Sequence, residues 1–214
     1  AADAYKTAGL SANEYMNTAT TFAAALVSSL GGDTEQAAEL ANTAISDMSD
    51  NANKMGTNIS SIQDAYNGFA KQNYTMLDNL KLGYGGTKTE MERLIDDANK
   101  LNAAQGKATN YTIDSYADVV SAIHDVQNAM GITGTTAKEA STTIQGSINA
   151  TKSAWSNLVT GIADDNANFE QLISNFVDSA TTAASNIIPR IEVALNGAAK
   201  LIESLVPPIM AELP

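Results

Sequence analysis

The sequence predicts an all-α protein, a multi-helix domain of short to medium helices joined by Gly-rich turns and followed by an amphipathic C-terminal helix. Three observations support this class. Helix-start signals recur along the chain, glycines follow the segments that they open, and the apolar residues between them keep helical spacing, as at Tyr15, Ala19, Phe22 and Leu26. No segment shows a convincing strand alternation. The spacing predicts helices over residues 11–30, 34–54, 58–82, 88–104, 115–130, 136–162, 168–186 and 189–206.

The first four helices are bounded by clear signals. Ser11 with Glu14 and Thr87 with Glu90 fit the capping box, in which a side-chain oxygen accepts an orphan helical N–H. Asp33 opens the second helix in the same manner. Stop signals follow at glycines, which favour the left-handed turn that ends many helices: Gly31, Gly32, Gly83, Gly85, Gly86 and Gly106. Gly56 either separates the second and third helices or only kinks a longer one.

The later helices follow a polar, turn-rich loop over residues 102–114. Gly131 ends the fifth helix, and Thr136 with Glu139 predicts the start of the sixth. Asn168 caps the seventh. Pro189 fits the first turn of the last helix, which Pro207 and Pro208 would end.

Composition limits both the core and the partners. Hydrophobic residues make up 44% of the 214 residues, yet most are Ala and only 6% are aromatic. Such a supply favours close-packed helices or packing completed by other chains. With 12 basic and 24 acidic residues the formal net charge is −12. Because phosphate contacts need a basic surface, we expect no specific nucleic-acid binding.

The chain has no cysteine, which excludes disulfides and thiolate metal sites. No signal peptide opens it, and no apolar run reaches the roughly 18 residues of a membrane span. Both ends look cut, so we expect an internal fragment of a longer protein, other parts of which would supply any membrane contact. We expect a helical domain over 1–165 and an amphipathic extension over 166–214.

No constellation of residues predicts catalysis, a cofactor or a metal site, so we expect no enzyme. The run Gly83–Thr89 lacks the Gly-Lys order of a phosphate-binding loop, and a turn that caps the next helix explains it better. His124, the only histidine, is better explained as structural than as a general base. Tyr66, Phe69 and Tyr74 are expected in the core. For Trp155 we expect core packing, with an interface anchor as the alternative.

The last helix carries apolar residues at alternating three- and four-residue steps, which is the spacing of a coiled-coil seam. They are Ile188, Ile191, Leu195, Ala198, Ile202 and Leu205. Two interpretations stay open with equal weight. The face packs on its own domain, or it joins copies of the chain.

Most of residues 11–163 resembles one protein family. The segment AKQNYTMLDNLKLGYGGTKTEMERLI (70–95) is similar to a motif of the tail tape measure proteins of long-tailed phages and prophages of Gram-positive bacteria. The likeness extends over 29–56, 61–71 and 115–163 in the same order. Family-motif or structural positions are Gly31, Gly32, Gly83, Tyr84, Gly85, Gly86, Thr87, Glu90 and Trp155.

The resemblance implies a structural protein without catalytic residues or cofactors. Family members fill the lumen of the growing tail tube, template its length and leave when the genome is ejected. It implies tail tube subunits, tail assembly chaperones and other copies of the chain, three or six, as partners. The implied locations are the virion tail lumen and, during assembly, the host cytoplasm. The alternative is an acidic helical binding module of a bacterial surface or secreted protein.

Overall fold

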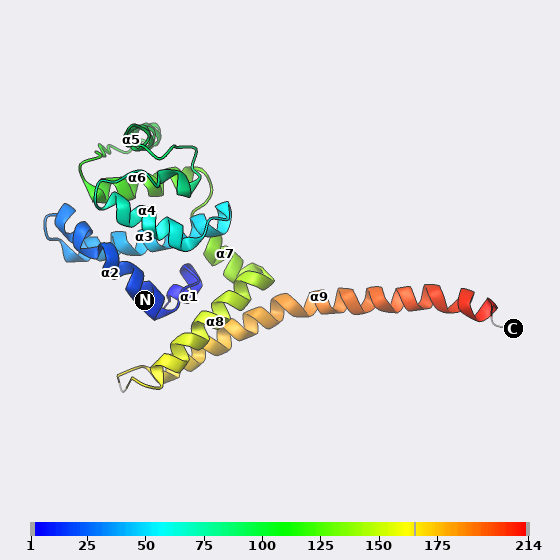
Figure 1. The fold of residues 1–214 in the computed structure, drawn as a ribbon. Coiled ribbons are helices and arrows are strands. Elements are labelled where there is room, and N and C mark those ends of the chain that lie inside the picture. The colour runs from blue at the N-terminus through cyan, green and yellow to red at the C-terminus, as the bar shows by residue number, and fades with distance from the viewer. Residues whose placement is uncertain (1–2, 165, 213–214) are drawn as a thin grey trace. The chain divides into compact units, whose positions relative to one another are not determined.

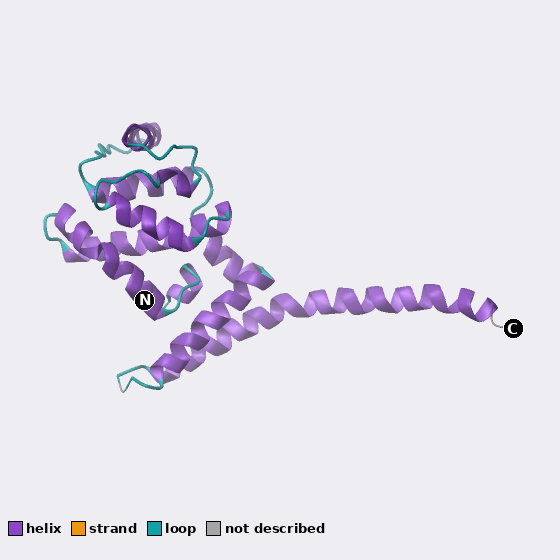
Figure 2. Ribbon diagram, in the orientation of Figure 1, coloured by secondary structure: helices purple, strands orange, loops and turns teal. Residues whose placement is uncertain are grey.

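The structure is a computed structural model that describes residues 3–164 and 166–212, with side chains described as far as Lys200. All the regular structure in these residues is helical, so the predicted all-α class is confirmed (Figures 1 and 2). The chain divides into two compact units, an N-terminal unit over Ala1–Glu139 and a C-terminal unit over Ala140–Pro214.

The N-terminal unit is a bundle of short helices, and the C-terminal unit is a hairpin of two longer ones. The N-terminal unit contains α1 (Ala4–Thr7), α2 (Ala12–Ser29), α3 (Thr34–Met55), α4 (Ile59–Phe69), η1 (Leu77–Leu80), α5 (Lys88–Ala104), α6 (Tyr116–Ala129) and most of α7 (Thr135–Thr142). The C-terminal unit contains α8 (Ile144–Gly161) and α9 (Phe169–Glu212).

Several predicted caps are confirmed. Ser11 and Glu14 form a complete capping box, because the Ser11 N–H donates to Glu14 Oε2 at 2.8 Å while Ser11 Oγ accepts from the Glu14 N–H at 3.4 Å. Asp33 Oδ1 accepts from the Gln36 N–H at 2.9 Å. Gly56 ends α3 with φ 66°, a left-handed conformation that glycine adopts without a Cβ penalty.

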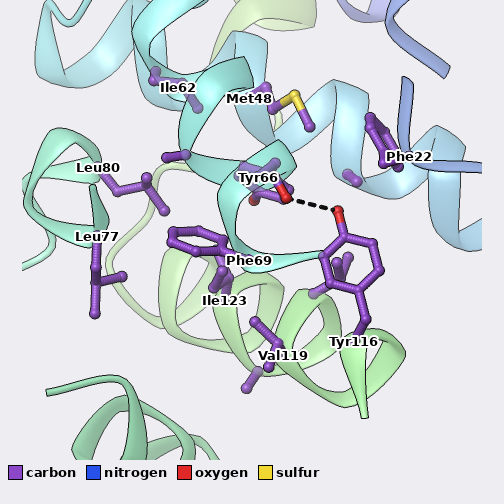
Figure 3. Close-up of a cluster of buried hydrophobic side chains, with 14 of the residues drawn as sticks. Phe22, Met48, Ile62, Tyr66, Phe69, Leu77, Leu80, Tyr116, Val119 and Ile123 are labelled. Carbon is purple, nitrogen blue, oxygen red and sulfur yellow. Dashed lines mark hydrogen bonds between the residues drawn. The ribbon is translucent and has the colours of Figure 1, made fainter. Parts of the chain in front are cut away.

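The N-terminal unit is built around large buried side chains (Figure 3). Tyr66, Phe69 and Tyr74 are all buried, as predicted. The Tyr116 hydroxyl donates to the Tyr66 carbonyl at 3.2 Å, which joins α6 to α4. Side chains of this cluster come from every main helix of the unit: Phe22, Leu26, Ile45, Met48, Ile62, Leu77, Leu80, Leu94, Val119 and Ile123.

The helix predicted over 58–82 is wrong beyond Phe69. There α4 ends, the chain turns at Gln72 with φ 56°, and only the short η1 follows. A Cβ at Gly68 would lie 3.0 Å from the Asn73 carbonyl oxygen, so a glycine lets the reversed chain pass close to α4. The reversal buries Tyr74 and Leu77, and this tertiary gain outweighs local helix propensity.

Two further helix boundaries differ from prediction. The helix expected over 136–162 is interrupted at Thr143, which is extended and whose side chain accepts the Gly146 N–H at 3.0 Å. The hydroxyl acts there as a helix cap, a role that competes with the helix interior. The helices expected over 168–186 and 189–206 form one helix, α9, which continues past Pro207 and Pro208 to Glu212.

Pro189 therefore lies inside α9 and not in its first turn. Its missing N–H leaves the Ser185 carbonyl without the usual intrahelical partner. Ser185 is exposed, so water can satisfy this carbonyl. Because α9 begins at Phe169 and is already formed over about five turns before the proline, it needs no new nucleation to continue.

The units divide after Glu139, earlier than the expected boundary between 165 and 166. The reason is that α8 packs along α9. These two helices therefore form one hairpin within the C-terminal unit.

We predict that Leu77→Ala lowers the free energy of unfolding of the N-terminal unit by about 2–5 kcal/mol, because Leu77 is 0% exposed and leaves a core cavity. Met76→Ala is the matched control, since the side chain of Met76, which precedes Leu77, is 38% exposed. For this variant we expect the free energy of unfolding to change by no more than about 0.5 kcal/mol. Urea unfolding followed by tyrosine signals measures this unit, because all 7 tyrosines precede residue 117. Equal losses in both variants would contradict the burial argument.

Candidate functional site

The contact between α8 and α9 is made of small and polar side chains. The buried residues are Ser147, Ala150, Ser153, Ala154, Asn157 and Leu158 on α8 and Asn175, Ser179 and Ala183 on α9. Small side chains let helix backbones approach closely. This contact buries few large apolar side chains, so it differs from the core of the N-terminal unit.

Two contacts mark the ends of this hairpin. Near the tip, a Cβ at Gly161 would lie 2.3 Å from Leu172 Cδ1, so a larger residue there would require the Leu172 side chain to move. At the other end, Asn186 Nδ2 lies 3.3 Å from the carbonyl oxygens of Ser141 and Thr143 and donates to them. Asn186 therefore marks the last turn of α9 that contacts the start of α8.

Large apolar side chains lie on the outside of the hairpin. Trp155 is 52% exposed, although its ring contacts Phe176 with centroids 5.2 Å apart. The expectation that Trp155 packs in a core is therefore wrong, because the hairpin contact is made by the opposite, small-residue face of α8. Other apolar side chains exposed in this way are Val159, Ile162, Phe169, Ile173 and Val177.

Helix α9 continues beyond Asn186 (Figure 1), and large apolar side chains are exposed on this part as well. Ile188, Ile191 and Leu195 are 56%, 51% and 65% exposed, and every residue from 188 to 200 is exposed. Ala198 belongs to this run. Ile202 and Leu205, the last two residues of the predicted seam, lie outside the residues whose side chains the structure describes. Among the described side chains, this face has no covering helix.

The glycine-rich motif forms a compact structural network. Thr87 caps α5 by accepting the Glu90 N–H at 3.2 Å, as expected, and the Glu90 carboxylate accepts from the Gly85 N–H at 3.0 Å. Arg93 bonds the Gly83 carbonyl at 2.8 Å and lies over the Tyr84 ring, 4.3 Å from its centroid. Thr87, Glu90 and Arg93 thus bind within the turn itself.

Tyr84 secures the other side of this turn. Its hydroxyl donates to Asp97 Oδ2 at 3.0 Å. Burial, followed by the bond to Asp97, raises the pKa of Tyr84 to about 12. The phenol therefore stays protonated at neutral pH and keeps donating this bond.

Gly86 is the sterically critical glycine of the motif. A Cβ there would lie 2.2 Å from the Thr75 carbonyl oxygen, a backbone atom, so the two segments can meet only at a glycine. At Gly85 the added Cβ would lie 3.5 Å from Glu90 Cγ, which is ordinary contact. The turn at Gly31 and Gly32 depends instead on backbone conformation, with φ 65° and 96°.

We predict that Gly86→Ala destabilises the N-terminal unit by about 1–3 kcal/mol, the usual range for overpacking. Gly85→Ala in the same motif is the control, and we expect it to unfold close to the parent. Urea unfolding followed by tyrosine fluorescence makes the comparison. If both variants unfold at the same urea concentration, the close approach to Thr75 does not explain why a glycine stands at position 86.

His124 is paired with a buried carboxylate. Its Nδ1 lies 2.9 Å from Asp47 Oδ2 and 3.0 Å from Oδ1, so the pair joins α6 to α3. Asp47 is 1% exposed. The hydrogen bond that His124 donates to Asp47 raises the pKa of His124, while burial raises the pKa of Asp47 against the opposing effect of His124. The ring nitrogen is thus engaged in an interhelical tie.

This pair makes stability depend on pH. The folded pKa of His124 lies above the unfolded value near 6.5. The contribution of His124 to the free energy of unfolding is therefore fully present below pH 6.5. It is lost as pH rises through the folded pKa. The raised pKa of Asp47 acts in the same direction. We predict that the free energy of unfolding of the N-terminal unit falls as pH rises above 6.5.

Urea unfolding at a series of pH values checks this prediction. His124→Gln should weaken the dependence, because glutamine is neutral throughout and still carries a donor. The chain has no second histidine to obscure the result. A parent protein whose stability is flat or rises over this interval would contradict the assigned tie.

Asp50 is a second buried carboxylate that the sequence analysis missed. It is 1% exposed, and its oxygens accept from the Gly134 N–H at 2.6 Å and the Thr136 N–H at 2.7 Å. These are orphan donors at the start of α7, so Asp50 holds that start against α3. An Asp near the middle of a helical sequence gives no signal of a partner 84 residues away.

The structure gathers little that resembles a ligand site. Asp164 and Asn168, whose spacing recurs in calcium loops, instead cap the hairpin tip by accepting the N–H groups of Asn166 and Gln171. Among the described residues, no group of three or more acidic or histidine side chains is placed to hold a metal ion. Within the same residues, no helix has both the length and the apolar character that crossing a membrane requires.

Comparison of the chain with protein-family models, curated proteins and solved structures found no match. The geometry therefore has to indicate the site. The candidate site is the exposed apolar surface of the C-terminal unit, and the predicted seam residues on it are Ile188, Ile191, Leu195 and Ala198.

Proposed function

We propose that this chain is a segment of a tail tape measure protein of a long-tailed phage or prophage. In this role it fills the lumen of the tail tube in several copies, contributes to the template for tube length and leaves with the genome. Its partners are other copies of itself, tail tube subunits and tail assembly chaperones. It is located in the virion tail and, before assembly is complete, in the host cytoplasm.

The observation that carries the proposal is the uncovered apolar face of α9 on an otherwise acidic, polar protein. Residues 188–200 are all exposed, and Ile188, Ile191 and Leu195 repeat at coiled-coil spacing. A face of this kind marks a binding surface. It suits a protein that lies beside identical copies, as the resemblance over residues 11–163 implies.

The charge of the chain supports the same role. A net charge of −12 repels the phosphates of DNA, so a filling of this composition can share a tube with a genome without holding it. Lys81, Lys88, Arg93 and Lys100 do not offset this, because Glu90, Glu92, Asp96 and Asp97 lie among the last three of them in the sequence. Arg93 also bonds Glu90 and Gly83, which occupies it within the glycine motif.

The folded-back helices limit what this segment contributes to length. A continuous helix of 214 residues would span roughly 320 Å at about 1.5 Å per residue. Here the N-terminal unit folds into a bundle instead. We therefore assign the segment to a folded part of the tape measure protein and not to the uniform rod that sets most of the length.

We predict that quantitative mass spectrometry finds peptides of this segment in purified virions at a few copies per tail, normalised to the tube subunit. Their number should fall after triggered genome ejection, because the protein leaves the tube. Tube-subunit peptides from the same sample are the control, since the tube remains.

Absence from intact virions would overturn the tail assignment. Recovery of the same peptides from the bacterial surface or culture medium would then favour the acidic binding module. Presence in virions without loss on ejection would keep a structural role but contradict the tape measure.

A further inference from the structure

Two Asn-Gly pairs occur in the chain, and the structure places them in opposite surroundings. One is Asn67 with Gly68 in α4, and the other is Asn196 with Gly197 in α9. In this dipeptide an asparagine reacts readily with its own backbone, because glycine has no Cβ to shield the peptide nitrogen that follows the asparagine. The two pairs therefore show what the surrounding structure does to the same chemistry.

The reaction is an intramolecular displacement. The glycine backbone nitrogen loses its proton and attacks Cγ, the side-chain carbonyl carbon of the asparagine. A bond between this nitrogen and Cγ forms, and a succinimide ring closes. The bond from Cγ to the amide nitrogen breaks, and the amide takes up the released proton and leaves as ammonia. Water then opens the ring at one of its two carbonyls, which yields an aspartyl or an isoaspartyl residue.

The reacting atoms in α4 are restrained by packing. This helix contacts α2, α3 and η1, and the Oδ1 atom of Asn67 is buried. The neighbours Tyr66 and Phe69 are 0% and 1% exposed. The Gly68 carbonyl accepts from the Asn73 N–H at 2.9 Å, which holds the reversed chain against the end of α4. Reaction at Asn67 thus requires that part of the core opens.

The pair in α9 has no such packing. Every residue from 188 to 200 is exposed, and a Cβ at Gly197 would meet no atom within 4 Å. Within the described side chains, no hydrogen bond holds the Asn196 amide. Asn186 on the same helix is different, since it donates to the carbonyls of Ser141 and Thr143. The Asn196 side chain is therefore free to turn toward the backbone.

The restraint that remains on Gly197 is the helix itself. Its N–H is tied to the carbonyl four residues earlier, at Val193, as in any α-helix. An isolated helix of this length is marginal in water, and both Pro189 and Gly197 weaken it further. Local opening costs little free energy where few contacts hold a segment, and approaches the global free energy of unfolding in a core helix. The Gly197 nitrogen is therefore released far more often than that of Gly68.

We propose that Asn196 with Gly197 is a self-modification site, at which the folded chain converts Asn196 to aspartyl and isoaspartyl residues while Asn67 stays intact. Each conversion replaces a neutral amide with a carboxylate and so adds one negative charge to the formal net charge of −12. The isoaspartyl product carries the main chain through its side chain, and the extra methylene interrupts the intrahelical hydrogen bonds of α9. The inference does not depend on the proposed function.

The experiment follows both sites in the purified chain during incubation in mildly alkaline buffer, which favours loss of the glycine N–H proton. Trypsin releases the sites in different peptides, 55–71 and 191–200, and mass spectrometry measures the converted fraction of each. We expect Asn196 to convert at least about tenfold faster than Asn67, because the free energy of opening enters the rate exponentially. In concentrated urea, where both helices are unfolded, the two rates should become similar.

Gly197→Ala is the matched control. Its Cβ meets no neighbour, so the variant keeps the fold. The added methyl group beside the attacking nitrogen and the stronger helix should both slow the conversion of Asn196. Circular dichroism of the incubated chain should show a loss of helical signal that is smaller in this variant.

Equal rates at Asn196 and Asn67 in the folded chain would overturn the inference. So would an acceleration by urea that is as large at Asn196 as at Asn67, since it would show that α9 protects its pair as well as the core does. An unchanged rate in Gly197→Ala would contradict attack by the Gly197 nitrogen. None of these outcomes changes whether the protein is found in virions, so they are distinguishable from a failure of the proposed function.

Discussion

Helix α3 carries the polar contacts on which the N-terminal unit depends. Its last turns bury Asp47, Asp50 and Asn51, and each holds a different element. Asp47 pairs with His124 of α6, Asp50 holds the start of α7, and Asn51 Nδ2 donates to the Leu80 carbonyl of η1 at 2.9 Å. A buried charge or amide costs free energy unless it is hydrogen-bonded. The folded N-terminal unit therefore requires all three of these bonds.

The large apolar side chains pack around this polar face. Phe22 and Leu26 of α2 and Tyr66 and Phe69 of α4 fill the space beside α3 and α6. The irregular stretch after α4 then becomes part of the core through Leu77. The glycine motif serves the same purpose, because Gly86 lets this stretch pass beside the start of α5. The polar bonds of this motif are local, since Glu90 accepts from the Gly85 N–H and Arg93 donates to the Gly83 carbonyl.

The C-terminal unit uses the opposite distribution of residues. Its helices meet through Ser, Ala and Asn, while Trp155 and the large aliphatic side chains lie outside. A hairpin of this kind gains little from its own apolar burial and exposes the surface that association would cover. The composition left two alternatives open, close-packed helices or packing completed by other chains, and the exposed apolar side chains of this unit are what the second alternative requires. The N-terminal unit thus buries its large apolar side chains within itself, whereas the C-terminal unit exposes them.

The sequence by itself determined the helical class, the caps at Ser11, Asp33 and Thr87, and the seam spacing from Ile188, because these depend on residues within a few positions of one another. It also excluded thiol chemistry outright. Tertiary structure decided where helices stop: packing of Leu77 ended α4 early, while a helix already nucleated against α8 continued through Pro189. It also decided the roles of Asp47, Asp50 and His124, whose partners lie on distant helices. Burial and long-range pairing leave no local pattern, so the polar centre of α3 and the outward position of Trp155 required the folded chain.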